Sequence, residues 1–486
     1  MIEAAASLLR LLLGLGAVFF LGYGFLAMLV PQPREFSLKE RAALSFGLGT
    51  LPLTLWMLAL TWWGLPFSLP LILGPLLVLA GAALLFKKYL GKGGQGQKAP
   101  DNPSPKPSPS TLYGFWDWLF LSLLALLFIF VTLRATIYPM WAWDAIATWG
   151  CKARVFYESR ALDLTCIEAH NYYPNLIPLL LSYLYFCLGR VNDHLVQGVF
   201  PLLGALLLTL LYSFLLRMGL TRRQALGTVT FFALNGTTFA VHLFIAYADL
   251  ALTYFALGAA GLLYLWLAGI APRGSLAVAA AFCAGMSWCK YEGSPLAVTI
   301  ILAAALTLVW LRPPGTGRRL LQLGWPLAGL AVGYLPWRIF AALQHLEMGA
   351  DHIQNIYPHQ FLQACYYLLA ALGNPYYFGV FWPALALTLI LAGRRSVNSP
   401  RLFLALFTGG NLLATLVAYG VAPTSAAEFP SYVLATLDRL LLHITPIAAL
   451  LLGEGVKELG EGLGERSSPS PSPKPPSQPP VRGRDL

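Results

Sequence analysis

Charged side chains are scarce in this sequence. Asp, Glu, Lys and Arg make up 11% of its 486 residues, whereas 57% of the residues are hydrophobic. A soluble globular domain carries about 25% charged residues. Together with a mean hydropathy of +0.65, this scarcity excludes a water-soluble protein and indicates an integral membrane protein built from helices.

Motifs for metal and nucleic-acid binding are missing too. The sequence has no DxD carboxylate pair, no HExxH and no CxxC, so no motif predicts a dedicated metal site or a resident cofactor. A divalent metal held by carboxylates is left open. The basic residues behind the net charge of +11 are spread over short loops. They therefore follow membrane topology and do not predict a nucleic-acid partner.

Long apolar runs take the place of these missing features. A transmembrane helix needs about 20 apolar residues, and about thirteen runs approach this length. Two shorter runs, 176–188 and 361–372, predict interfacial or re-entrant helices. We therefore expect an all-α polytopic membrane protein with about 13 transmembrane helices. The predicted spans are 7–30, 44–64, 69–86, 115–133, 195–216, 225–241, 250–267, 276–288, 294–311, 321–341, 378–391, 402–419 and 440–452.

Lys and Arg gather in alternate loops, and such loops normally face the cytoplasm. This places the N-terminus outside and the C-terminus inside, which agrees with an odd number of spans. The basic loops are 34–41, 87–106, 217–223, 273, 312–319 and 394–401. The opposite, extracytoplasmic loops are 134–194, 242–249, 289–293, 344–359 and 421–439.

Two segments rich in Pro, Ser and Gly are too poor in apolar residues to fold and predict disordered chain. They divide the sequence into four parts. We expect an N-terminal three-helix membrane segment (1–90), a cytoplasmic linker (91–112), a membrane core (113–455) and a cytoplasmic tail (456–486).

The first extracytoplasmic loop of the core contains the polar, aromatic stretch 141–157. Asp144 opens an amphipathic run that predicts a helix lying on the bilayer surface. Two interpretations stay open: Asp144 caps this helix, or it is a catalytic carboxylate at the water–lipid boundary. Trp143 beside it is either an interfacial aromatic or a residue that stacks on a sugar.

A second carboxylate, Asp249, stands at the outer start of a predicted span. It is either another helix cap or a costly intramembrane charge with a task. Asp144 and Asp249 are expected on the same side of the membrane. Two carboxylates on one face allow general-base chemistry together with the holding of a substrate or a metal.

Three cations are expected on that same side. Lys290, Arg338 and Arg439 each stand at an outer helix end, where a single cation is usually an interfacial anchor. Together they predict a site for a lipid phosphate, because cations stabilise a phosphate leaving group. Glu292 forms either a local ion pair with Lys290 or part of this site. Tyr173 opens the next apolar run, an ordinary place for an interfacial tyrosine.

Two of the six cysteines, Cys151 and Cys166, share the first outer loop. An oxidising compartment would permit a disulfide between them. Their geometry is not set by the sequence, so free thiols are the alternative.

Several of these residues recur in a recognisable order. An aspartate follows the first core span, YP opens the next apolar run, ADLALTYFALGA begins a later helix, and K-x-E-G joins two short helices. PW at an outer helix end and R-L-L-x-x-x-x-P come later. Residues 113–455 thus resemble the GT-C superfamily of membrane glycosyltransferases, nearest to protein O-mannosyltransferases and lipid A aminoarabinose transferases.

The resemblance implies a GT-C-like core and an inverting sugar transfer. The donor sugar would be carried on a polyprenyl phosphate among the membrane lipids, and the acceptor would be a hydroxyl of a lipid, glycan or protein. The reaction would take place at the extracytoplasmic face of the inner or plasma membrane. The resemblance places the general base on Asp144, a second acidic position on Asp249 and phosphate contacts on Lys290 and Arg439.

The sequence also departs from the family pattern. Many relatives have two adjacent acids in the first loop, whereas Ala145 follows Asp144 here, and Leu440 stands where relatives often have Tyr. A transporter or lipid flippase is the alternative from another class, although no inverted repeat is evident. A surface-polysaccharide polymerase or ligase would differ mainly in its acceptor. The candidate catalytic residues are Asp144 and Asp249, and the candidate substrate-binding residues are Lys290, Glu292, Arg338, Arg439, Trp143 and Tyr173.

Overall fold

The computed structural model describes residues 2–93, 113–346, 355–392 and 398–467, and within these ranges every regular element is helical. Residues 94–112 of the predicted linker and 468–486 of the predicted tail lie outside the described residues. The helices are α1 (Ile2–Leu29), η1 (Pro33–Glu35), α2 (Leu38–Trp62), α3 (Leu69–Gly93), α4 (Phe115–Ile137), η2 (Ala145–Gly150), α5 (Cys151–Ser159), α6 (Leu176–Leu188), α7 (Asp193–Val196), α8 (Val199–Arg217), α9 (Arg222–Leu234), α10 (Thr238–His242), α11 (Ala248–Leu267), α12 (Ser275–Cys289), α13 (Gly293–Leu311), α14 (Thr316–Gln322), α15 (Gly324–Leu343), α16 (Pro358–Leu372), α17 (Pro375–Phe378), α18 (Phe381–Ala392), α19 (Arg401–Gly420) and α20 (Phe429–Ser467).

Ten helices of the described chain are long and apolar enough to cross a membrane. The all-α polytopic class is therefore confirmed, but the count of thirteen spans is not. Two of the predicted spans are shorter apolar helices: α12 has 15 residues and α18 has 12. Apolar helices of this length are too short to cross the membrane alone and are typical of helices buried within a bundle.

The predicted span 225–241 is wrong, because the chain breaks between α9 and α10. At the break, the side chain of Asn235 accepts a hydrogen bond from the backbone N–H of Val380 at 2.9 Å. The backbone N–H of Thr237 donates to the carbonyl of Tyr376 at 2.8 Å. These bonds to the α17 region replace the helical hydrogen bonds that an uninterrupted span would make.

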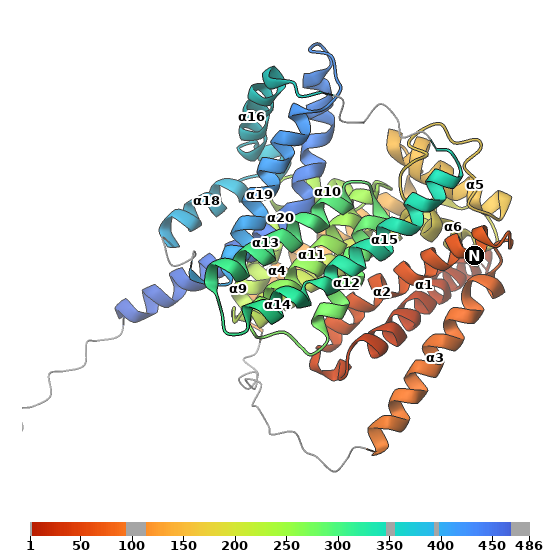
Figure 1. Cartoon of the computed structure of the whole chain (residues 1–486), viewed down its shortest axis with the longest axis horizontal. Coiled ribbons are helices and arrows are strands. Elements are labelled where there is room, and N and C mark those ends of the chain that lie inside the picture. Colours follow the sequence, from red (N-terminus) through yellow and green to blue (C-terminus); the bar gives the residue numbers. More distant parts are fainter. Residues whose placement is uncertain (1, 94–112, 347–354, 393–397, 468–486) are drawn as a thin grey trace, which may run out of the picture.

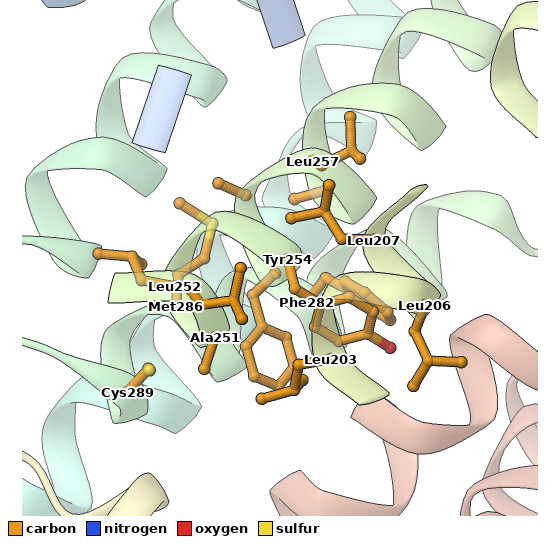
Figure 2. Close-up of a cluster of buried hydrophobic side chains, with 14 of the residues drawn as sticks. Leu203, Leu206, Leu207, Ala251, Leu252, Tyr254, Leu257, Phe282, Met286 and Cys289 are labelled. Atoms are coloured by element: carbon orange, nitrogen blue, oxygen red, sulfur yellow. The ribbon is translucent and has the colours of Figure 1, made fainter. Parts of the chain in front are cut away.

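Helix α11 forms the centre of the bundle (Figure 1), and 94% of the residues in its most apolar stretch are buried inside the protein. Figure 2 shows Leu203 and Leu207 of α8 gathered with Tyr254 of α11 and Phe282 of α12. Helix α2 joins this core through polar bonds as well. The hydroxyl of Tyr254 donates to the carbonyl of Ala43 and accepts from the N–H of Gly47.

Helices α12 and α15 approach each other very closely. A Cβ atom on Gly329 would lie 1.9 Å from the carbonyl oxygen of Ala280, and one on Gly333 would lie 2.1 Å from that of Ala284. These two glycines are four residues apart, which is the small-residue spacing that lets membrane helices pack backbone to backbone. This contact fixes the end of α12 that leads into Lys290.

Turns that were expected on one side of the membrane also meet in space. At one end of the bundle, the side chain of Glu35 accepts from the N–H of Arg273 at 2.7 Å, and Arg217 pairs with Glu40. At the other end, Arg190 pairs with Glu3 at 2.7 Å. The basic turns around Arg34, Arg217 and Arg273 therefore share one end of the bundle, and the start of α1 and the turn after α6 share the other.

Candidate active site

Asp144 lies at the start of a helical segment that begins with π-helical turns. Residues Ala145–Gly150 form the π-helix η2, and α5 continues from it. The helix expected here is present, but Asp144 makes no side-chain capping bond. Its Oδ2 atom instead lies 2.8 Å from Nη1 of Arg439 on α20. The capping interpretation is therefore wrong, and Asp144 enters a long-range ion pair.

Asp249 is not a cap either, because the N-cap position of α11 is held by Tyr247. The carboxylate of Asp249 is completely buried, and its Oδ1 atom collects three partners. Nζ of Lys290 lies at 2.9 Å, Nε2 of His443 at 3.1 Å and Nε of Arg439 at 3.5 Å. A negative charge at this position is also favoured by the dipole of α11.

Lys290 ends α12 in extended backbone, which turns its side chain towards the network. Its ammonium contacts Asp249 and also Oε1 of Glu292, at 3.0 Å. Burial alone would lower the pKa of Lys290, but the carboxylates of Asp249 and Glu292 outweigh it and raise the pKa above its usual value. The amine therefore stays protonated, and Lys290 is held between two carboxylates.

The tight turn behind Lys290 depends on Gly293. A Cβ atom at this position would lie 1.9 Å from the backbone carbonyl oxygen of Met286. Only glycine lets the start of α13 fold back against the last turn of α12. The K-x-E-G spacing thus has a structural cause, because it brings Lys290 and Glu292 to the same side of the turn.

His443 belongs to the network, although no motif in the sequence singles it out. It follows Arg439 by four residues on α20, so the two side chains share one face of the helix. Both contact Oδ1 of Asp249. The i, i+4 spacing on an expected helix was the one available signal, and it became informative only once Asp249 was placed opposite.

We call the residues Asp144, Asp249, Lys290, Glu292, Arg439 and His443 the ion-pair network. Arg439 bridges its two candidate catalytic carboxylates and also lies 4.9 Å from the ring centroid of Tyr247. The side chain of Asp144 is 17% exposed and that of Asp249 is 0% exposed. Asp144 is thus the carboxylate that a substrate can reach, whereas Asp249 is an internal anchor.

Two carboxylate oxygens of the network are buried without a hydrogen-bond partner in the described part of the chain. They are Oδ2 of Asp249 and Oε2 of Glu292. Each can only accept hydrogen bonds, and a buried acceptor without a donor costs about 1–3 kcal/mol. These two atoms therefore favour a partner that carries hydrogen-bond donors.

The remaining candidates lie around the network in different ways. Tyr173 stacks on Trp149 with ring centroids 5.8 Å apart, and burial, with Glu292 nearby, raises its pKa well above the usual value. Trp143 packs edge-on to His170 at 6.2 Å. Arg338 enters none of the ion pairs described for the network and lies 5.8 Å from the ring of Tyr334 on its own helix.

The disulfide considered for the first outer loop is not formed. Cys151 and Cys166 are both free thiols, Cys151 at the start of α5 and Cys166 exposed in the following loop. Within the described ranges, no group of three or more His, Cys, Asp or Glu side chains is arranged to hold a metal ion. Lys290, Arg439 and His443 supply the basic groups around Asp249.

These features define a polytopic helical membrane protein with a buried carboxylate–cation network at one end of its bundle. Neither a family model nor a curated protein matches the sequence. Among solved structures, it is similar to ArnT from Cupriavidus metallidurans bound to undecaprenyl phosphate, with a TM-score of 0.52 and 15% identity over 73% of this chain. The apo state of ArnT gives a TM-score of 0.50 over 72% of this chain, again with 15% identity.

The matched region covers 62% of the ArnT chain bound to undecaprenyl phosphate and 61% of the apo chain, so this protein spans less than two thirds of its structural neighbour. ArnT is a lipid A aminoarabinose transferase of the GT-C type. The likeness confirms the GT-C-like fold that the ordered motifs led us to expect.

Proposed function

We propose that this protein is a membrane glycosyltransferase that moves a sugar from a polyprenyl-phosphate-linked donor to an acceptor hydroxyl. The observation that carries the proposal is the convergence of Asp144 and Asp249 on Arg439, with only Asp144 open to a substrate. The fold likeness to ArnT, solved with undecaprenyl phosphate, supports the class of donor. The acceptor is a lipid, a glycan or a protein.

In this proposal, Asp144 is the general base. Its carboxylate takes the proton of the acceptor hydroxyl, and the oxygen attacks the anomeric carbon of the donor sugar. The bond from that carbon to the phosphate oxygen breaks on the opposite face, which inverts the configuration. The electron pair leaves with the polyprenyl phosphate, so charge and atoms balance without a further reactant.

Arg439 is the better placed cation for the leaving phosphate. It is partly exposed and spans the two carboxylates, whereas Lys290 is only 2% exposed and already contacts both Asp249 and Glu292. A guanidinium can turn two N–H groups towards a phosphate while it keeps a carboxylate contact. Lys290 then contributes mainly by keeping Asp249 charged and in place.

An apolar cavity of about 420 Å³ offers room for a hydrocarbon chain. It lies among α16, α18, α19 and α20 and is lined by residues such as Trp382, Leu412 and Leu451. Leu451 follows Arg439 by twelve residues on α20, a distance of about 18 Å along a helix. A prenyl chain in this cavity would hold its phosphate near the network and present the sugar in a fixed orientation.

The test is transfer from radiolabelled polyprenyl-phosphate sugars by purified protein in nanodiscs, with isolated cell-envelope lipids and glycans as acceptors. Asp144→Asn should lower the rate by about 10²–10⁴, because an amide cannot take the proton. Glu158→Gln is the matched control, since Glu158 is an exposed carboxylate on the adjacent α5. It should retain the wild-type rate.

A folded Asp144→Asn protein that transfers sugar at the wild-type rate would remove the proposed base. The base would then have to be sought among the other outer carboxylates, beginning with Asp249. A wild-type protein that transfers no sugar from any polyprenyl-phosphate donor would reject the proposed activity itself. Thermal unfolding in the same nanodiscs separates both outcomes from misfolding.

A further inference from the structure

Aromatic rings form an unbroken chain along one side of the ion-pair network. Trp143 contacts His170 with ring centroids 6.2 Å apart, and His170 contacts Tyr172 at 6.0 Å and Tyr173 at 5.0 Å. Tyr172 and Tyr173 each lie 6.4 Å from Tyr291. We call these five residues the aromatic chain.

The two ends of the aromatic chain coincide with two parts of the network. Trp143 immediately precedes Asp144, and Tyr291 stands between Lys290 and Glu292. Segments far apart in sequence therefore bring the rings and the charges together. Tyr173, in the middle of the aromatic chain, also lies close enough to Glu292, Arg439 and Asp249 for their charges to act on its hydroxyl.

Both terminal rings are accessible. Trp143 is 64% exposed and Tyr291 is 41% exposed. The middle of the aromatic chain is held in place by the protein. Nε1 of Trp337 on α15 donates to the carbonyl of Tyr172 at 2.8 Å, and the ring of Tyr173 stacks on the buried Trp149. The exposed rings are thus mounted on a rigid support, which lowers the entropic cost of binding.

The combination of groups identifies the chemistry of the ligand. The faces of aromatic rings carry negative charge and attract polarised C–H groups. Oε2 of Glu292, whose side chain is 31% exposed, has no hydrogen-bond donor in the described part of the chain and calls for one. A hydrocarbon chain offers no donors, and a phosphodiester offers only acceptors. A sugar ring has C–H groups on its faces and hydroxyl donors on its edge.

We propose that the aromatic chain, with Trp143 and Tyr291 as its contact residues, binds a sugar ring that is presented to Asp144. This inference rests on the proposed function and specifies where the sugar is recognised. The ring belongs either to the polyprenyl-linked donor or to a glycan acceptor. The same surface chemistry serves both, and binding experiments separate them.

The binding test uses the full-length protein in phosphatidylcholine nanodiscs, without sugar-based detergents. One set of discs contains polyprenyl-phosphomannose, polyprenyl-phosphoglucose or bare polyprenyl phosphate. Another set is titrated with soluble maltotriose and chitotriose. Trp143→Ala and Tyr291→Ala should each weaken sugar binding about 2- to 12-fold, the loss expected for one aromatic contact. Tyr291→Phe keeps the ring and should bind almost as wild type.

Trp310→Ala is the matched control, because Trp310 on α13 is 62% exposed, close to the value for Trp143. It should leave all binding constants unchanged. A loss confined to the sugar-bearing polyprenyl phosphates assigns the ring to the donor. A loss confined to the oligosaccharides assigns it to the acceptor.

Four results would overturn the inference. Both alanine variants could bind every sugar probe as tightly as wild type, or wild type could bind no sugar probe saturably. The variants could also lose bare polyprenyl phosphate as strongly as its sugar-bearing forms, which would make the rings a lipid-facing belt. If wild type transfers sugar while either alanine variant keeps its KM for both substrates, the sugar site fails and the proposed activity stands.

Discussion

At the scale of single residues, Arg439 is the side chain that connects the candidate catalytic groups. Its guanidinium joins Asp144, which a substrate can reach, to Asp249, which is fully buried. Arg439 thus contacts one partly exposed carboxylate and one fully buried carboxylate. The buried carboxylate is also paired with Lys290. Substitutions at the two aspartates should therefore have different consequences.

Asp249→Asn should damage stability more and catalysis less than Asp144→Asn. Breaking a buried ion pair costs about 3–5 kcal/mol, because the remaining charge is left without its partner. Urea unfolding in nanodiscs measures this loss, and the transfer assay measures the rate. Unfolding of Asp249→Asn at the wild-type urea concentration would contradict the anchoring role.

Lys152 is a second buried cation, and it makes the stability depend on pH. It lies fully buried on α5, where Nζ donates to the carbonyl of His170 at 2.6 Å and no described carboxylate pairs with it. Burial lowers the pKa of Lys152 to about 7. Between about pH 7 and the ordinary value near 10.4, the unfolded chain binds a proton that the folded protein does not.

The free energy of unfolding should therefore rise as the pH increases from about 7 to 9, by at most about 1.4 kcal/mol per pH unit. Unfolding of wild type and Lys152→Met at several pH values measures this contribution as a difference. Lys457→Met is the control, because Lys457 also donates to a carbonyl, that of Met218 at 2.9 Å, but is only partly buried. Parallel profiles for wild type and Lys152→Met would show that the amine does not titrate in this range.

At the scale of elements, the turn between α12 and α13 decides where Lys290 and Glu292 lie. The close approach of Gly329 and Gly333 to α12 fixes one side of this turn. The contact of Gly293 with Met286 fixes the other side. Backbone contacts, more than side-chain packing, thus position the charged pair.

Gly293→Ala tests this dependence. The added methyl group cannot fit 1.9 Å from a backbone oxygen, so the turn must shift, at a cost of about 1–3 kcal/mol. Gly317→Ala on α14 is the control, since its Cβ would meet nothing within 4 Å. It should be neutral or stabilising by up to about 1 kcal/mol. Equal unfolding midpoints for the two variants would contradict the role of the Gly293 turn.

At the scale of the whole molecule, the bundle has two chemically different ends. The ion-pair network and the aromatic chain gather at one end, and the basic turns around Arg217 and Arg273 meet at the other. The excess of Lys and Arg in these turns predicts that the second end faces the cytoplasm. The proposed reaction then takes place on the extracytoplasmic side.

Cysteine labelling of intact cells tests this orientation. Residues Ser108 and Ser470, in the predicted linker and tail, lie outside the described residues and are suitable positions for single reporter cysteines. Both should react with a membrane-impermeant maleimide only after the cells are opened. Thr165→Cys in the Cys166→Ala background should react from outside, because this part of the first outer loop is exposed. The reverse pattern would show that the protein has the opposite orientation and would move the proposed reaction to the cytoplasmic side.

The sequence alone determined the membrane class, most of the long helices and the placing of the candidate charges in loops at one end of the bundle. These features are local, because an apolar run and a terminal charge can be recognised without knowing their neighbours. The same locality explains the errors. The run at 225–241 is apolar enough for a span, and the turn dipeptide Asn235–Gly236 inside it became decisive only through the bond from the N–H of Val380 to Asn235.

Only the tertiary structure decided which charges meet. Asp249 is 41 residues from Lys290 and 194 residues from His443, and their contacts depend on the rotation and depth of α11, α12 and α20. The same packing buried Lys152, exposed Trp143 and made Arg439 a bridge where the sequence offered only a cation at a helix end. Pairing of this kind depends on contacts between helices that are far apart in sequence, such as that of Gly333 with Ala284, and a local pattern does not name the partner.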